Sequence, residues 1–325
     1  MRVFITGATG FVGGALVRAL AQDGAEVHAL ARSVSARGVL DGIPIIWHEG
    51  DITIPQTLSG VFEGADWIIH AAGLLGKFGV SEQVYQRLNV EGTRNVLEAA
   101  LASASRARVL HVSSPGVLGP TTREPVAEDA PYFPSNPYER SKTTAEQVAR
   151  DFAKGGLDVL IARPGFIYGP GDRHVLGVFK AIRSGHFFYI DGGRHFCHPT
   201  FIADAVAGML MCLRRGRRGE AYHIVGPSPV TFRTMGETIA TALGVGAPWL
   251  SLPRWLATSI AIGAEMLGSV LGRTPPLTRT GVAFFSEDRV FSRQKAGDEL
   301  GYAPQHDLAM GASGTVAWYR EHGWL

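Results

Sequence analysis

The order of apolar and polar residues divides the first half of the chain into short apolar runs and longer amphipathic stretches. The runs have the length and composition of buried parallel strands, and the stretches have the apolar spacing of helices. This pattern predicts strands at 2–5, 25–30, 44–48, 67–71, 108–112 and 158–162. It predicts helices at 11–22, 81–104, 137–154 and 174–184. Such alternation is typical of an α/β fold, a doubly wound parallel sheet with helices on both faces.

Beyond residue 172 the alternation becomes irregular. A helix at 202–213 and a strand at 221–225 are expected to return to the sheet. Two further helices, at 231–243 and 253–271, are expected to form a smaller C-terminal cap. We therefore predict a sheet domain made of 1–171 with 199–225, and a substrate-binding cap made of 172–198 and 226–325.

Three glycines, Gly7, Gly10 and Gly13, separate the first strand from the first helix. In such a turn glycine lets the backbone approach a pyrophosphate, and the helix N-terminus attracts the phosphate charge. Strand, glycine turn and helix together are the setting that a dinucleotide-binding motif requires. The alternative is a tight turn without a ligand.

Tyr138 and Lys142 are four residues apart in a predicted helix, so their side chains lie on one face. A phenol beside an ammonium is suited to proton transfer, because the cation favours the phenolate. We therefore expect Lys142 to lower the pKa of Tyr138 towards neutral pH.

The glycine turn and the Tyr138–Lys142 pair, with several further segments, resemble the extended short-chain dehydrogenase/reductase family. That family includes nucleotide-sugar epimerases and dehydratases, 3β-hydroxysteroid dehydrogenases and dihydroflavonol reductases. The further matching segments are Gly50–Ile52, His70–Gly73, Asn89–Thr93, Val112–Ser114, Arg163–Pro164 and Tyr168–Pro170. The match covers about residues 1–172 and weakens beyond them. It implies a Rossmann fold that binds NAD or NADP, and a homodimer joined through the helices at 81–104 and 137–154.

The resemblance also implies roles for individual residues. Ser114 and Tyr138 would hold the substrate oxygen, Tyr138 would transfer the proton, and Lys142 would bind the nicotinamide ribose. The catalytic residues are then Ser114, Tyr138, Lys142 and Asn89. The cofactor-binding residues are Gly7, Thr9, Gly10, Phe11, Val12, Gly13, Arg32, Asp51, Ile52, Ala71, Ala72, Gly73, Tyr138, Lys142, Pro164, Gly165 and Ile167. The substrate-binding residues are Ser114, Phe166, Arg173 and Cys197, and no metal is expected.

Several of these assignments have a structural alternative. Ser113 competes with Ser114 at the end of its strand. Asn89 is explained equally well as a helix-start cap. Asp51 is alternatively a turn carboxylate, and His70 is interpreted as structural.

The cofactor preference depends on the end of the second predicted strand. Enzymes that use NAD usually place an acidic residue there to bind the ribose 2′-hydroxyl. Here Ala31 and Arg32 follow the strand, and a guanidinium suits a 2′-phosphate. The sequence therefore favours NADP, with NAD as the alternative.

Two departures from the nucleotide-sugar branch concern the substrate. Phe166 stands where those enzymes commonly carry a substrate-binding asparagine, and Cys197 stands where they carry an arginine for the diphosphate. Arg194 or Arg173 could replace that arginine. The cap is also rich in apolar segments, namely Phe187–Tyr189, Trp249–Leu250 and 253–272. These form either core or an apolar substrate wall, and 253–272 could instead lie on a membrane surface as an amphipathic helix.

Composition narrows the functional classes. The chain has 325 residues and a net charge of +2, which argues against a nucleic-acid partner, and the basic run at 214–218 is interpreted as a solvated loop. The two cysteines suit a reducing compartment, and no signal peptide or membrane-spanning segment is expected, so we predict a cytoplasmic protein.

The leading interpretation is an NAD(P)-dependent oxidoreductase that interconverts a secondary alcohol and a ketone on a small, apolar substrate. The alternative is a nucleotide-sugar epimerase or dehydratase with tightly bound NAD. A third interpretation is a non-catalytic nucleotide-sensing protein.

Overall fold

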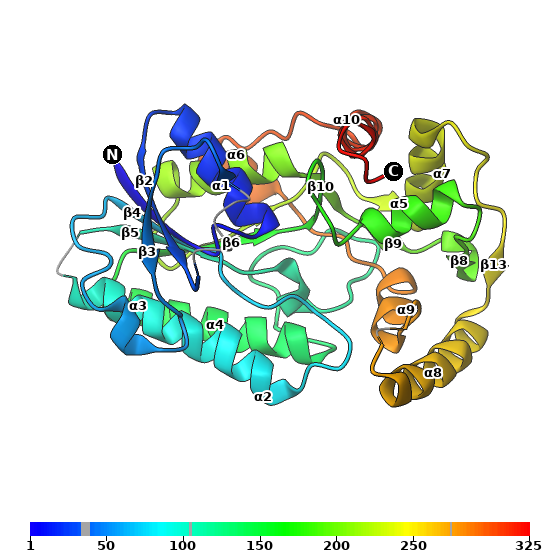
Figure 1. Cartoon of the computed structure of the whole chain (residues 1–325), viewed down its shortest axis with the longest axis horizontal. Helices are drawn as coiled ribbons and strands as arrows, with labels where there is room; N and C mark the ends of the chain where they lie inside the picture. Colours follow the sequence, from blue (N-terminus) through cyan, green and yellow to red (C-terminus); the bar gives the residue numbers. More distant parts are fainter. Residues whose placement is uncertain (34–39, 104–105, 274) are drawn as a thin grey trace.

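A parallel sheet of seven strands forms the centre of the computed structural model, which describes residues 1–33, 40–103, 106–273 and 275–325 (Figure 1). The strand order is β11-β6-β5-β4-β1-β2-β3, and every pair is parallel. The strands are β1 (Arg2–Thr6), β2 (Glu26–Ala31), β3 (Ile45–Glu49), β4 (Trp67–His70), β5 (Arg108–Val112), β6 (Val159–Pro164) and β11 (Ala221–Ile224). All six strands expected in the first half, and the strand expected to return to the sheet, are confirmed.

Helices cover both faces of this sheet (Figure 1). On one face α1 (Phe11–Gln22) and α6 (Ile202–Arg215) pack their apolar sides into one core cluster. On the other face α3 (Gly92–Ala102) and α4 (Pro137–Lys154) pack into a second. The Rossmann-type, doubly wound fold is therefore confirmed.

The helix expected at 81–104 is interrupted. It consists of α2 (Glu82–Tyr85), a wider π-helical turn at Gln86–Glu91, and α3. Such turns insert a residue into the helical repeat and are frequent at functional sites. Ala104, the last residue of the expected helix, lies outside the described residues.

The cap is built from helices and short strand pairs after β6. Its helices are α5 (Leu176–Arg183), α7 (Phe232–Leu243), α8 (Arg254–Leu271), α9 (Arg279–Phe285) and α10 (Leu308–Glu321). Its strand pairs are β8 (Tyr189–Ile190) with β13 (Ser251–Leu252), and β9 (Phe196–Cys197) with β12 (Val230–Thr231). A third short pair, β7 (Phe166–Tyr168) with β10 (Pro199–Phe201), belongs to the segments predicted for the sheet domain. Short turns of other helix types lie at Pro55–Leu58, Pro115–Leu118, Asp191–Gly193 and Ala296–Leu300. The sequence pattern predicted α5, α7 and α8 but missed α9, α10 and the short strands. The division into two domains stays a prediction.

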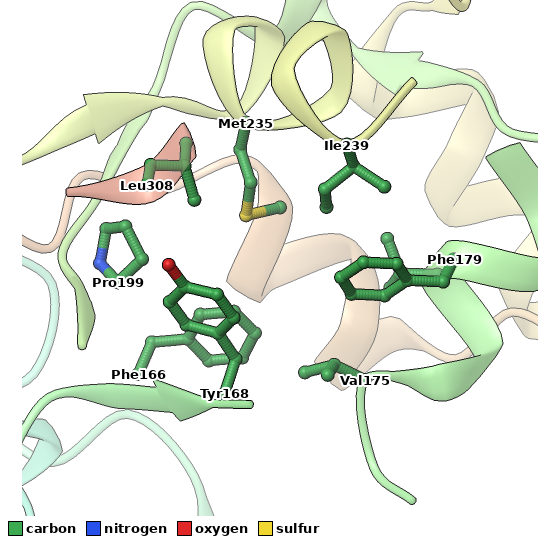
Figure 2. A pocket seen from close by; sticks show the side chains of 9 residues that line it. Phe166, Tyr168, Val175, Phe179, Pro199, Met235, Ile239 and Leu308 are labelled. Atoms are coloured by element: carbon green, nitrogen blue, oxygen red, sulfur yellow. The ribbon is translucent and has the colours of Figure 1, made fainter. Parts of the chain in front are cut away.

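Some apolar segments of the cap are packed in its interior, and others are exposed on its surface. Phe187 and Tyr189 pack inside it, with ring centroids 5.5 Å apart. The cap core between α5, α7 and β7 contains a cavity of only about 10 Å³, lined by apolar side chains such as Phe179 and Met235 (Figure 2). Trp249 and Trp255, by contrast, are exposed.

Part of the surface of the helices expected to join a homodimer packs within the chain itself. Ala100, Ala145 and Ala149 belong to the core cluster beneath α3 and α4. The homodimer therefore stays a prediction.

Candidate active site

The glycine turn brings the end of β1 against the end of β4. Gly7 has a φ of +74°, and a Cβ there would lie 2.6 Å from the backbone nitrogen of Ala72. A Cβ on Gly13 would lie 2.1 Å from the carbonyl oxygen of Gly7. Only glycine fits either position, because the backbones of the turn, of α1 and of the segment at Ala71–Ala72 approach so closely.

Helix α4 starts at a fixed point, which positions Tyr138 in its first turn. The Asn136 side chain accepts a hydrogen bond from the Glu139 backbone N–H at 3.0 Å, and Pro137 occupies the first helical position. The Glu139 carboxylate accepts hydrogen bonds from the backbone N–H and the hydroxyl of Ser135, both at 2.8 Å. These contacts form a reciprocal cap around the residue next to Tyr138.

Ser114, Tyr138 and Lys142 are brought together where β5 ends. The Lys142 ammonium, one turn along α4 from Tyr138, donates to the Val112 carbonyl at 2.7 Å. Ser114 interacts with the Tyr138 phenol, whereas the Ser113 hydroxyl donates to Glu146 at 2.9 Å. Adjacent residues of an extended strand point in opposite directions, so only Ser114 is directed at the tyrosine.

The expected shift in the pKa of Tyr138 is wrong in direction. Burial raises the pKa of Tyr138 to about 12, and the hydrogen bond with Ser114 only partly opposes this rise. Burial also lowers the pKa of Lys142 to about 8, against the attraction of the Glu146 carboxylate. Loss of solvent disfavours the charged form of each group, and it is the largest effect on the pKa of both. At neutral pH the site therefore holds a neutral phenol beside an ammonium.

Asn89 supports the segment that covers Tyr138. Its side-chain oxygen accepts from the Leu74 N–H at 2.7 Å, and its amide nitrogen donates to the Leu74 carbonyl at 3.1 Å. The same amide donates to the Ser141 hydroxyl at 2.9 Å. Asn89 lies inside the π-helical turn, so the interpretation as a helix-start cap is wrong. These three hydrogen bonds are consistent with a supporting role for Asn89 beside Tyr138.

Tyr85 holds the same segment from the neighbouring helical turn, and the sequence analysis missed it. Its hydroxyl accepts from the Lys77 N–H at 2.8 Å, and its ring lies edge-on to Tyr138 with centroids 6.3 Å apart. Gly76 lies over the Tyr138 ring, because a Cβ there would be 3.7 Å from it. The segment 74–77 is thus fixed against the Cβ and the near edge of the ring of Tyr138.

The remaining cofactor candidates flank the carboxyl ends of the strands. The Asp51 carboxylate accepts from the N–H and the hydroxyl of Thr53, so the turn-carboxylate interpretation is confirmed. Ile52 is buried, and Arg32 is exposed at the end of β2. On the other side of the sheet Pro164 ends β6, and Gly165 lies so close to Thr200 that a Cβ would be 2.7 Å from its hydroxyl. Of the other candidates, Thr9, Phe11, Val12 and Ile167 are partly buried and Gly10 and Gly73 are exposed.

The three substrate candidates of the cap do not converge. Phe166 is partly buried, with its ring 5.3 Å from that of Phe284 on α9. The Arg173 guanidinium instead lies 5.0 Å from the centre of the Trp324 ring. The Cys197 thiol is buried against Met235, and burial raises its pKa to about 12.

His70 is structural, as interpreted. It is buried, and its ring nitrogens hydrogen-bond the hydroxyls of Thr6 at 2.8 Å and Thr93 at 3.0 Å. Burial lowers its pKa to about 3, so the ring is neutral near pH 7.

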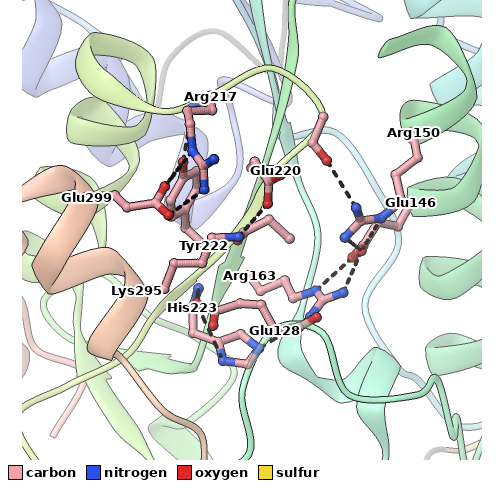
Figure 3. Close-up of polar contacts among 12 residues, drawn as sticks. Glu128, Glu146, Arg150, Arg163, Arg217, Glu220, Tyr222, His223, Lys295 and Glu299 are labelled. Atoms are coloured by element: carbon pink, nitrogen blue, oxygen red, sulfur yellow. Dashed lines mark hydrogen bonds and ion pairs between the residues drawn. The ribbon is translucent and has the colours of Figure 1, made fainter. Parts of the chain in front are cut away.

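A buried ionic network joins α4 to β6 (Figure 3). The fully buried Glu146 carboxylate accepts from the Arg163 guanidinium at 2.6 and 3.0 Å. It also accepts from Tyr132 at 2.8 Å and from Arg150 at 3.2 Å. Burial acts to raise the pKa of Glu146, but its hydrogen bonds to Arg163 and the nearby guanidiniums outweigh burial and lower it. The sequence analysis missed this network, although Tyr138, Lys142, Glu146 and Arg150 recur every four residues on one helix face.

A second ion pair, also missed, joins the cap to the start of α4. Arg289 is buried and donates to Glu139 at 2.8 Å, although the two residues are 150 positions apart. Glu139, the residue next to Tyr138, is therefore held both by the helix-capping contacts at the start of α4 and by the C-terminal part of the chain.

The described residues at the carboxyl ends of β1, β2 and β4 fit a dinucleotide. The cradle formed by Gly7, Gly13 and Ala71–Ala72 would be filled by any Cβ on the two glycines. Gly10 is the N-cap residue of α1, which has no side-chain cap and no acidic residue in its first turn, so its N–H groups suit a phosphate. No group of three His, Cys, Asp or Glu side chains within the described ranges is arranged to hold a metal ion.

Comparison with known proteins supports this interpretation of the site. The NAD dependent epimerase/dehydratase family model matches residues 3–225. The chain is 32% identical over 313 residues to the 4-hydroxy-2-methyl-3-oxo-4-farnesyl-3,4-dihydroquinoline-1-oxide ketoreductase of Stigmatella aurantiaca, covering 93% of this chain and 92% of that protein. It is 29% identical over 327 residues to the 2-alkyl-3-oxoalkanoate reductase of Stenotrophomonas maltophilia, covering 96% and 97%. A crystal structure of dTDP-glucose 4,6-dehydratase from Streptomyces venezuelae with NAD bound has a TM-score of 0.81 and 28% identity, covering 100% of this chain and 98% of that chain.

Proposed function

Because this chain belongs to the NAD dependent epimerase/dehydratase family, within the extended short-chain dehydrogenases/reductases, we propose that it is a ketoreductase acting on a small, apolar substrate. In this proposal it interconverts a ketone and a secondary alcohol. The observation that carries the proposal is the neutral phenol of Tyr138, set beside Ser114 and one helical turn from the Lys142 ammonium.

Tyr138 acts as the general acid in the reducing direction. Its pKa of about 12 keeps the phenol protonated at neutral pH, so it has a proton to give to a carbonyl oxygen. Ser114 donates a second hydrogen bond to that oxygen and holds it in place. The nicotinamide, when bound, supplies the hydride.

Lys142 stabilises the phenolate that remains after the proton has left. Its own pKa of about 8 leaves it mostly cationic at neutral pH, and it loses that charge above pH 8. Glu146 and the Arg163 behind it hold the helix face on which both groups lie. Ketone reduction therefore declines on the alkaline side of pH 8.

Apolar side chains on the segment that covers Tyr138 and in the cap support an apolar substrate. Leu75 is exposed on the segment above Tyr138, and Phe166 and Phe284 form an aromatic pair on the cap side. Cys197 is buried where nucleotide-sugar enzymes commonly carry an arginine. The two reductases compared above carry a farnesyl group and an alkyl group in the names of their substrates.

A ketone panel tests the proposal. The purified protein is given NADH or NADPH with β-keto esters and β-keto acids of increasing alkyl length, and cofactor oxidation is followed by absorbance. We expect kcat/KM to rise with chain length, because each buried methylene adds about 0.8 kcal/mol of binding. Turnover of no ketone, together with conversion of a nucleotide sugar, would refute it.

The cofactor preference is a separate part of the proposal. We propose that NADP is preferred, since Arg32 is exposed at the end of β2 without a neighbouring carboxylate at position 31. The expected result is a lower KM for NADPH than for NADH, with the difference shrinking in Arg32→Ala. Arg106→Ala, an exposed arginine before β5 at the opposite end of the sheet, is the matched control. Equal constants in the parent enzyme would rule out the preference.

The alternative is a nucleotide-sugar epimerase or dehydratase. It is favoured by the likeness to dTDP-glucose 4,6-dehydratase over the whole chain. In that case NAD stays bound through the turnover, so it copurifies with the protein, and a UDP- or dTDP-sugar raises the melting temperature. If the purified protein contains no bound NAD and shows no such shift in melting temperature, the epimerase or dehydratase alternative is excluded and the ketoreductase proposal is favoured.

A further inference from the structure

Helix α8 presents an unusual surface to solvent. Six large apolar side chains on α8 and on the segment before it are well exposed. These are Trp249, Trp255, Met266, Leu267, Val270 and Leu271, which we call the α8 surface. Trp249 is 84% exposed, Trp255 70% and Val270 83%. Monomeric proteins rarely expose so many large apolar side chains together, and such patches mark interaction sites.

The opposite face of α8 already has its partner. Ala257, Ala261 and Gly268 are buried, and α8 packs this side towards α9 at the outer edge of the cap (Figure 1). The single carboxylate of the helix, Glu265, lies on this buried side and accepts from the Arg279 guanidinium at 2.6 Å. A surface helix normally needs only one such apolar stripe. The exposed apolar residues are therefore additional to those that hold α8 in the fold.

The exposed apolar side chains span an arc of α8 that is too wide to be covered by one packed protein surface. Ile260 and Ile262 are both exposed, yet they point about 160° apart at roughly 100° per residue. A helix that packs on a protein surface contacts it through a stripe on the order of 100° wide. A lipid bilayer instead surrounds a helix that sinks partway into it, and so covers a wider arc.

Charge at the edges of the α8 surface suits anionic headgroups. Arg254 and Arg273 are exposed at the two ends of the helix, and Arg279 is exposed beside it. Arg254 also pairs with Glu287 at 3.2 Å and Arg279 with Glu265, so Arg273 is the arginine for which no carboxylate partner is seen among the described residues. From Trp249 to Arg273 the only acidic residue is the buried Glu265. Exposed tryptophans favour the boundary between headgroups and acyl chains, because their rings are apolar and carry one N–H donor.

We propose that α8 lies in the plane of a membrane surface containing anionic lipids, with the α8 surface inserted among the headgroups. At about 1.5 Å per residue the helix is about 27 Å long, and no helix in the described part of the chain is long and apolar enough to cross a membrane. Apolar burial provides most of the binding, and the arginines add a preference for anionic lipid. This surface is independent of the chemistry proposed for Tyr138.

Vesicle flotation with the full chain tests this proposal. We expect the protein to float with vesicles of phosphatidylcholine mixed with phosphatidylglycerol, and less with phosphatidylcholine alone. The double variant Trp255→Gln with Val270→Gln removes two anchors, and its partition coefficient should fall about tenfold or more. Arg273→Glu should weaken binding to the anionic vesicles only. The matched control, Leu101→Gln with Met310→Gln, changes side chains that are 57% and 56% exposed elsewhere, and it should float like the parent.

Two further measurements keep the test decisive. The circular dichroism and melting temperature of the double variant should equal those of the parent, since both replaced side chains are exposed. The mass in solution is followed by light scattering. A parent protein that floats with neither vesicle, or a double variant that floats equally well, overturns the proposal. If a dimer dissociates in the double variant and neither protein binds vesicles, a second copy covers α8 and the membrane proposal is wrong.

Discussion

Glu146→Gln tests two roles of the buried network between α4 and β6: its contribution to the free energy of unfolding and its effect on the pKa of Lys142. Glu146 and Arg163 are both fully buried, and two hydrogen bonds of 2.6 and 3.0 Å join them. Removing one partner of such a pair leaves the other charge buried and unpaired, which costs about 3–5 kcal/mol. We therefore expect the free energy of unfolding to fall by that amount in urea denaturation, partly offset by the remaining contacts of Arg163.

The same variant should change the pH dependence of catalysis. Burial lowers the pKa of Lys142 to about 8, and the Glu146 carboxylate opposes that shift. Without this carboxylate the pKa of Lys142 falls further, so the ammonium is lost at lower pH. The alkaline limb of kcat for ketone reduction should then move to lower pH.

Arg163→Met is the matched control for this prediction. It breaks the same ion pair and should cost a similar free energy of unfolding. Glu146 keeps its contacts with Arg150 and Tyr132, so at the alkaline pH of the limb its carboxylate should stay charged and favour the Lys142 ammonium. The alkaline limb of this variant should therefore not move to lower pH. An unmoved limb in Glu146→Gln, or the same downward shift in both variants, would refute the reasoning.

Two further predictions concern the segment above Tyr138 and the glycine turn. Asn89→Ala removes both hydrogen bonds to Leu74. In steady-state kinetics kcat should fall about tenfold or more, and in urea denaturation the free energy of unfolding should fall by about 1–3 kcal/mol. An unchanged kcat would contradict the supporting role of Asn89. Gly13→Ala places a methyl group 2.1 Å from a backbone oxygen and should abolish binding of the reduced cofactor in a fluorescence titration. Gly177→Ala, which meets no neighbour, should bind normally, and equal binding by both variants would contradict the close approach.

The sheet and helix α4 were predictable because their signals are local. Apolar runs identify the seven strands, and the spacing of Tyr138 and Lys142 already places both on one helix face. The π-helical turn at 86–91 was not predictable, since one additional residue in a turn barely changes the apolar spacing. Helices α9 and α10 are short or weakly amphipathic, and packing against the rest of the cap decides them.

Long-range contacts explain most of what the sequence did not predict at the site. The pairing of Arg289 with Glu139 depends on how the C-terminal part of the chain returns to α4. The pKa of Tyr138 was predicted with the wrong sign because residue spacing reveals a neighbouring charge but not the burial that outweighs it.

The proposed role of Tyr138 is tested most directly by replacing it with phenylalanine and measuring both turnover and cofactor affinity. The change removes only the hydroxyl, so the Kd for the reduced cofactor should stay within about twofold, while kcat/KM for a ketone that the parent reduces should fall by about 10²–10⁴, the usual contribution of a general acid. Turnover by Tyr138→Phe equal to that of the parent enzyme would contradict the proposed chemistry.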